Sequence, residues 1–103
     1  MNNKRILDFS ITGQQMKKEG DFSNIVSGTA GYLVASFTCS SEWSGCRMAA
    51  VFSRFDKEYP VPIINGKCQI PKEITVYKEW KVQLIGEREE YRIVTNKVEV
   101  KQI

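Results

Sequence analysis

The amino-acid sequence predicts an all-β fold, an antiparallel sandwich of two sheets with about eight strands. Two observations lead to this prediction. Apolar and polar residues alternate with period two, as in strands with one buried face, and turn-forming residues interrupt the alternation about every eight to twelve residues. The chain also shows no long helical pattern, no internal repeat and no low-complexity linker, which disfavours an α/β arrangement.

The length of 103 residues predicts a single domain that covers residues 1–103. A domain of this size buries only roughly 60 to 65% of its unfolded surface, which is enough for one core. No segment approaches the roughly 18 apolar residues that span a bilayer, so we expect no membrane partner. The N-terminus shows no cleavage site of an export signal, and we expect the chain to stay in the compartment where it is made.

The first half of the chain predicts three strands. Alternation places Leu7, Phe9 and Ile11 on one face of the first strand. Gly13 interrupts that pattern, and a polar stretch at 17–27 is expected to be an irregular connection. A turn over 40–45 precedes the third strand. The predicted strands are Leu7 to Ile11, Tyr32 to Phe37 and Arg47 to Phe55.

Two turn signals follow the third strand. Asp56-Lys57 predicts a tight hairpin turn that leads into a strand over 59–64. Pro60 and Pro62 each lack a backbone donor, so this strand is expected at a sheet edge. Asn65-Gly66 predicts a second hairpin, because a type I′ turn needs positive φ at both central residues.

The last third of the chain predicts a short strand over 67–70, one helical turn over 71–74, and three further strands. The clearest strand contains Trp80, Val82 and Leu84 in one phase, which places Trp80 in the core. A turn over 86–90 is expected after it. Returning strands over 91–95 and 97–103 complete the predicted set.

Composition argues against catalysis, cofactors and metals. The chain has no histidine, its carboxylates fall mostly in turns or on solvent faces, and its seven glycines are scattered singly, so we expect no enzyme. Cys39, Cys46 and Cys68 lack a Cys-x-x-Cys pair and are expected to be reduced, buried thiols rather than metal ligands. The net charge is +3 without a basic block, so nucleic acid is not an expected partner.

Aromatic residues in end loops are candidates for a binding site. Trp43 lies in the polar turn before the third strand, and Tyr59 lies near the second hairpin. A loop aromatic can stack on a sugar or anchor a protein partner. The alternative is that the ring of Trp43 folds back over the open end of the core.

A second candidate is an interface made by the strands at 32–37 and 47–55, which carry apolar residues on both faces. Val34, Ala49, Val51 and Phe55 lie opposite the inward set. Either the N-terminal strand or the 17–27 segment covers these side chains, through Met16 or Ile25, or they form a subunit interface.

The residue order resembles the immunoglobulin-like domain of tail and baseplate proteins of phages of Gram-positive bacteria, such as the domain that opens siphophage upper baseplate proteins. The matching residues are packing and turn residues spread over most of the chain. They are Tyr32-Leu33, Ala35, Phe37, Glu42-Trp43, Gly45, Ala50, Phe52, Cys68, Ile70-Pro71, Glu73-Ile74, Thr95-Asn96, Val98 and Val100.

The resemblance implies an immunoglobulin-like antiparallel β-sandwich of seven to nine strands and a structural role in the virion. It implies assembly in the host bacterial cytoplasm, contacts with other virion proteins or copies of itself, and no chemistry. The members that it resembles continue into coiled-coil or receptor-binding regions, whereas this sequence ends with its last predicted strand. Two other interpretations are a module that binds a host-surface saccharide or host protein through Trp43 with Tyr59 or Tyr77, and a phage-encoded inhibitor of a host protein.

Overall fold

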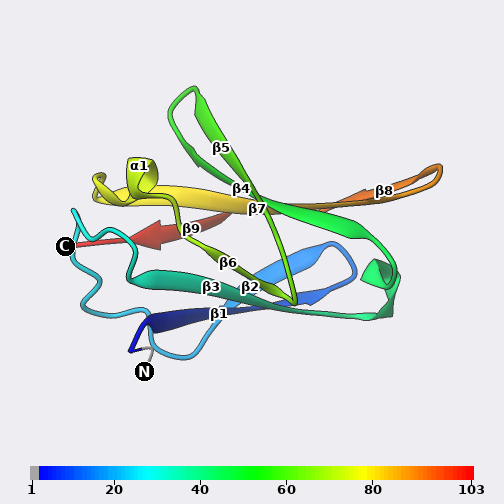
Figure 1. The fold of residues 1–103 in the computed structure, drawn as a ribbon, viewed down its shortest axis with the longest axis horizontal. Helices are drawn as coiled ribbons and strands as arrows, with labels where there is room; N and C mark the ends of the chain where they lie inside the picture. Colours follow the sequence, from blue (N-terminus) through cyan, green and yellow to red (C-terminus); the bar gives the residue numbers. More distant parts are fainter. Residues whose placement is uncertain (1–2) are drawn as a thin grey trace.

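The computed structural model describes residues 3–103, which form two β-sheets stacked as a sandwich (Figure 1). Sheet A contains, in spatial order, β2 (Gln15–Glu19), β1 (Arg5–Thr12), β3 (Leu33–Cys39) and β6 (Lys67–Gln69). Sheet B contains, in spatial order, β5 (Lys57–Pro62), β4 (Arg47–Arg54) and β7 (Glu79–Arg88), and then β8 (Tyr91–Val94) and β9 (Val98–Lys101), which both pair with β7. The predicted all-β sandwich is confirmed.

The chain passes between the two sheets three times. It crosses from β3 to β4, returns from β5 to β6, and crosses again to β7, while β4 with β5 and β7 with β8 form hairpins within sheet B. The strand pairing is antiparallel with one exception. β1 and β3 run parallel, with Arg5 opposite Leu33 and Ile11 opposite Cys39, a pairing that the sequence did not predict.

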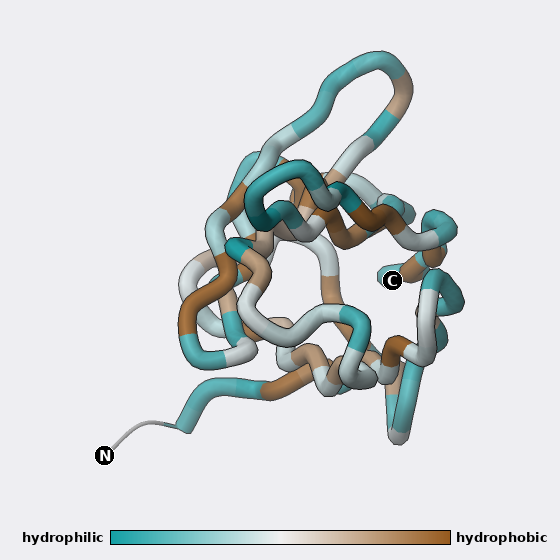
Figure 2. Tube along the Cα trace, turned by 90° about the vertical axis from the view of Figure 1, so that its right-hand side faces the viewer, coloured by the Kyte–Doolittle hydropathy of each residue, from teal (hydrophilic) through white to brown (hydrophobic). Residues whose placement is uncertain are grey.

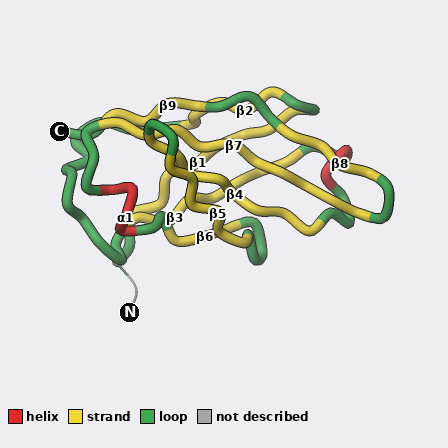
Figure 3. Tube along the Cα trace, turned by 90° about the horizontal axis from the view of Figure 1, so that it is seen from above, coloured by secondary structure: helices red, strands yellow, loops and turns green. Residues whose placement is uncertain are grey.

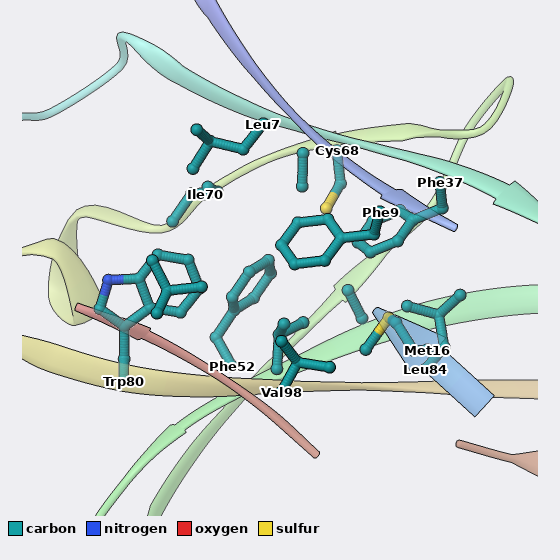
Figure 4. Packing of buried hydrophobic residues seen from close by; sticks show 14 of the residues in the cluster. Leu7, Phe9, Met16, Phe37, Phe52, Cys68, Ile70, Trp80, Leu84 and Val98 are labelled. Atoms are coloured by element: carbon teal, nitrogen blue, oxygen red, sulfur yellow. The ribbon is translucent and has the colours of Figure 1, made fainter. Parts of the chain in front are cut away.

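The core lies between the sheets and consists of the inward residues that alternation predicted (Figure 4). The rings of Phe9 and Phe37 stack with centroids 5.2 Å apart, and those of Phe52 and Trp80 meet edge to face at 5.6 Å. Trp80 is only 1% exposed, which confirms its predicted place. Met16 and Ile25 are also buried between the sheets, so neither covers an outer face.

Three predicted segments differ from the structure. The 17–27 segment is not wholly irregular, because β2 extends into it as far as Glu19 and forms a hairpin with β1. The turn between β4 and β5 lies at Phe55-Asp56, one residue earlier than predicted, and Phe55 has a positive φ of 56°. Asn65 and Gly66 do form a turn with positive φ, but β5 and β6 on either side belong to different sheets, and a single bridge joins Ile64 to Lys67.

The predicted turn at 86–90 is shorter, because β7 continues to Arg88 and Gly86 lies inside the strand. Glycine is required at this position in the strand for a steric reason. A Cβ on Gly86 would lie 2.8 Å from Cε3 and Cζ3 of Trp43, so the missing side chain makes room for the indole. The glycine is therefore a packing residue and not a turn residue.

Two short helical segments lie at opposite ends of the sandwich (Figure 3). The four-residue helix α1 (Lys72–Thr75) follows Pro71, and this confirms the predicted helical turn. A 3-10 turn (Ser41–Trp43) lies at the other end, where the hydroxyl of Tyr91 donates to the carbonyl of Glu42 at 3.0 Å. Each segment contributes a buried side chain to the core, Ile74 at one end and Trp43 at the other.

Candidate functional site

The outer face of sheet B carries an apolar surface across four adjacent strands. Pro62, Ala49, Ile85 and Val94 align in register from β5 through β4 and β7 to β8. Val51 lies two residues further along β4, with Pro60 opposite it on β5 and the polar Gln83 opposite it on β7. We call the six apolar residues Ala49, Val51, Pro60, Pro62, Ile85 and Val94 the outer apolar patch.

Burial separates the patch into a centre and an edge. Ala49, Val51, Ile85 and Val94 are half-buried by their neighbours on the sheet, whereas Pro60 and Pro62 on the edge strand are exposed. Both prolines lack the backbone donor that would recruit another strand, so β5 resists edge pairing. The patch is therefore suited to contact through its face rather than through its edge.

Charged side chains border the patch at both ends. Arg47, Glu87 and Arg92 lie at one end, where Arg92 Nη1 donates to Glu87 Oε2 at 2.9 Å. Lys81 and Glu99 face each other at the other end. An apolar centre with a polar rim is the usual layout of a protein interface.

The outer face of sheet A has a different character. Its exposed positions are mostly polar or charged, and include Asp8, Thr12, Lys17, Thr38 and Lys67. Val34 lies on this face beside Ile6, with which it is paired in register. The sandwich therefore has one polar outer face and one apolar outer face.

This arrangement divides the four residues predicted as one interface. Ala49 and Val51 belong to the outer apolar patch, but Val34 lies on the opposite side of the molecule, because β3 and β4 belong to different sheets. Phe55 lies at the tip of the β4–β5 hairpin and is 82% exposed. A single surface made from all four residues is therefore wrong. The sequence did not point to Ile85, Val94, Pro60 and Pro62 as residues of this surface.

Trp43 is buried and does not present its ring to a ligand. It is 2% exposed, and its indole Nε1 donates to the carbonyl of Gly13 at 2.8 Å. The hydroxyl of Ser40 accepts from the Gly13 N–H at 2.8 Å and donates to Glu42 at 2.5 Å. The bond from Ser40 holds the pKa of the Glu42 carboxyl below its usual range. The alternative in which Trp43 closes the end of the core is confirmed.

Tyr59 also points inward. It is half-buried on β5, opposite Phe52, and packs against the core. With Trp43 and Tyr59 both packed inward, the two residues do not form a common exposed surface for a saccharide. The predicted loop site is therefore not assembled.

The acidic and thiol side chains are the remaining candidates for chemistry. Within residues 3–103, no group of three or more His, Cys, Asp or Glu side chains is arranged to hold a metal ion. Cys39, Cys46 and Cys68 are free thiols, but only Cys68 is buried, so the prediction of three buried thiols was wrong for the half-buried Cys39 and Cys46. Burial raises the pKa of the Cys68 thiol to about 12. The pKa of the Cys39 thiol is also raised, mainly by burial and to a smaller extent by the charge of Cys46. A raised pKa disfavours the reactive thiolate.

None of the helical segments in the described part of the chain has the length and apolar character needed to cross a membrane. Comparisons with known protein families, with curated proteins and with solved structures find no match to this chain. The fold and the surface together define a small β-sandwich protein with one apolar outer face.

Proposed function

We propose that this chain is a structural protein of a phage or prophage particle, a module of the tail or baseplate or an accessory of the particle. It acts through protein contacts and not through catalysis. It assembles in the host bacterial cytoplasm and functions in the virion. The outer apolar patch on sheet B carries this proposal, because a half-buried apolar row with a charged rim suits a protein partner.

The residues behind the sequence resemblance support a structural role. Trp43 closes one end of the core, and Asn96 joins the two sheets through bonds to Met16. These residues fix the shape of the module rather than a reactive site. A rigid module with one apolar face is well suited to contacts repeated around a symmetry axis.

The first test locates the protein. Particles released from the source bacterium are separated on a density gradient, and each fraction is probed for the chain. We expect the chain in the particle fractions. Recovery of the chain only among free proteins would overturn the virion assignment.

The second test asks which face makes the contact. Val51→Lys places a charge in the outer apolar patch, and Thr38→Lys places the same charge on the central strand of the polar face. We expect Val51→Lys to reduce incorporation into particles by at least about tenfold, whereas Thr38→Lys retains it. Equal incorporation of both variants would contradict the use of sheet B.

A further inference from the structure

Strain and exposure coincide at Phe55. This residue has a positive φ of 56° and a side chain that is 82% exposed. Both features are unfavourable for a bulky aromatic residue, and glycine is the usual residue at such a position. The guanidinium of Arg54 lies 4.1 Å from the ring centroid and is held in place by a 2.9 Å bond to Glu79. Backbone strain of this kind often marks a position used in recognition.

The hairpin presents Phe55 away from the body of the sandwich. In Figures 1 and 2 the β4–β5 hairpin rises from sheet B on the side opposite sheet A. A hollow of about 300 Å³ lies beside the tip and is lined by Phe55, Lys81 and Glu99, among others. The ring therefore stands on the same side of the molecule as the outer apolar patch.

A second hollow lies at the opposite end of the same face. It has a volume of about 250 Å³ and is lined by Met48, Ala49 and Ile85, with Arg47 and Glu87 at its rim. Small-molecule sites usually occupy roughly 300 to 1,000 Å³ in deeper clefts. A shallow apolar hollow of this size suits one protruding side chain better than a ligand.

We propose that two copies of this chain associate face to face through sheet B, with Phe55 of each copy seated in the hollow of the other. The inference rests on the assembly role proposed above and names the partner. Val51 lies midway along β4 between Arg47 and Phe55, four residues from each. A two-fold axis that lies between the two faces at Val51 and runs across the strands reverses the strand direction of the second copy. Each hairpin tip then lies over the hollow of the other copy.

The charges at the two ends agree with this pairing. Asp56 and Lys57 follow Phe55 at the tip, and Arg47 and Glu87 border the hollow. In the reversed arrangement, Asp56 of one copy approaches Arg47 of the other. A parallel arrangement would instead bring each tip onto the same tip, with like charges together.

The available area is at the lower limit for a specific interface. Four strands about 4.8 Å apart, and eight residues of β4 at about 3.4 Å each, give a face of about 19 by 27 Å. Two such faces bury about 1,000 Å² in total, the least that a specific interface requires. We therefore expect a dimer that dissociates on dilution, with Phe55 as its principal anchor.

Sedimentation velocity over a wide concentration range tests the dimer. The unmodified chain should sediment as a dimer at high concentration and as a monomer on dilution. Phe55→Gly should weaken dimerisation by at least about 30-fold, as expected for loss of a hot spot. Because glycine relieves the positive φ, the monomer of this variant should melt no lower than the unmodified chain, which separates lost contact from lost folding. A chain that stays monomeric at every concentration overturns the proposal.

Two further variants test the geometry. Asp56→Arg and Arg47→Asp should each weaken the dimer, and the double variant should restore it, because each copy carries both charges. Val51→Cys should cross-link to itself on oxidation, as expected for a residue on the two-fold axis, whereas Thr38→Cys should not. Failure of the charge swap, or equal cross-linking at both cysteines, overturns the tip-to-hollow arrangement. A monomeric chain found in particles would overturn the dimer proposal and support the virion role. A dimeric chain absent from particles would support the dimer and overturn the virion role.

Discussion

The side-chain amide of Asn96 bonds to both backbone groups of Met16. The Met16 N–H donates to Asn96 Oδ1 at 2.7 Å, and Asn96 Nδ2 donates to the Met16 carbonyl at 3.1 Å. The backbone N–H of Asn96 also donates to the carbonyl of Gln14 at 3.2 Å. Because Met16 lies on edge strand β2 of sheet A and Asn96 lies between β8 and β9, these bonds join the two sheets. They also occupy edge groups of β2 that another strand could otherwise use.

Replacement of Asn96 tests this connection. Asn96→Ala removes both side-chain bonds to Met16, and we expect a loss of about 1 to 2 kcal/mol in unfolding free energy, measured by urea denaturation. Asn96→Asp keeps the acceptor for the Met16 N–H but places a carboxylate against the Met16 carbonyl. It should therefore be no more stable than Asn96→Ala. An alanine variant as stable as the unmodified chain would contradict the role of this amide.

Gly86→Ala should destabilise the fold by about 1 to 3 kcal/mol, because the new Cβ would overlap the ring of Trp43. Chemical denaturation measures the effect. The matched control is the same change in a Trp43→Ala background, where the ring is absent and alanine should cost almost nothing relative to glycine. An equal cost in both backgrounds would mean that the loss arises from the strand backbone and not from the indole.

The two tryptophans should respond differently to replacement by phenylalanine. Trp43 donates to the carbonyl of Gly13, whereas the Nε1 of Trp80 has no hydrogen-bond partner within residues 3–103. Trp43→Phe therefore loses packing and a bond, about 2 to 3 kcal/mol, and Trp80→Phe loses packing alone, about 1 kcal/mol. Thermal or urea denaturation of both variants measures the difference. A greater loss for Trp80→Phe would reverse this assignment.

Cys68 should make stability fall at alkaline pH. Burial raises the pKa of its thiol from 9.0 to about 12 in the folded chain. Below pH 9 the thiol is protonated in both states and has no effect. Between pH 9 and 12 the unfolded chain loses this proton first, so stability decreases as pH rises. Subtracting the pH profile of Cys68→Ala from that of the unmodified chain isolates this part, and a flat difference above pH 9 would contradict it.

The sequence predicts the inward residues of this fold well, because each strand has one clearly apolar phase. Trp80, Val82 and Leu84 are all buried as expected, and Pro60 and Pro62 lie on an edge strand. Turn positions are less accessible to this kind of inference. Phe55 occupies a positive-φ position that favours glycine, so no sequence rule would select it.

The candidate site was only partly predictable, because period two shows which residues share a face of one strand but not which strands share a sheet. Val34 and Val51 looked equivalent along the sequence and lie on opposite sides of the molecule. Ile85 was missed because Gly86 suggested a turn there. Only the register shows that Ala49, Ile85 and Val94 form one row.

The parallel pairing of β1 with β3 has a consequence for the order of folding. Every aligned pair, from Arg5 with Leu33 to Ile11 with Cys39, is separated by the same 28 residues. β1 and β2 can meet as a local hairpin soon after synthesis, but this hairpin has no place in sheet A until β3 has left the ribosome. Closure of that long loop is a slow, non-local event. Sheet B has the same requirement, because β4 pairs with β7 across 28 residues at Ser53 and Lys81 and across 40 at Arg47 and Glu87. We therefore expect the β1–β2 and β4–β5 hairpins to form early and both sheets to close late.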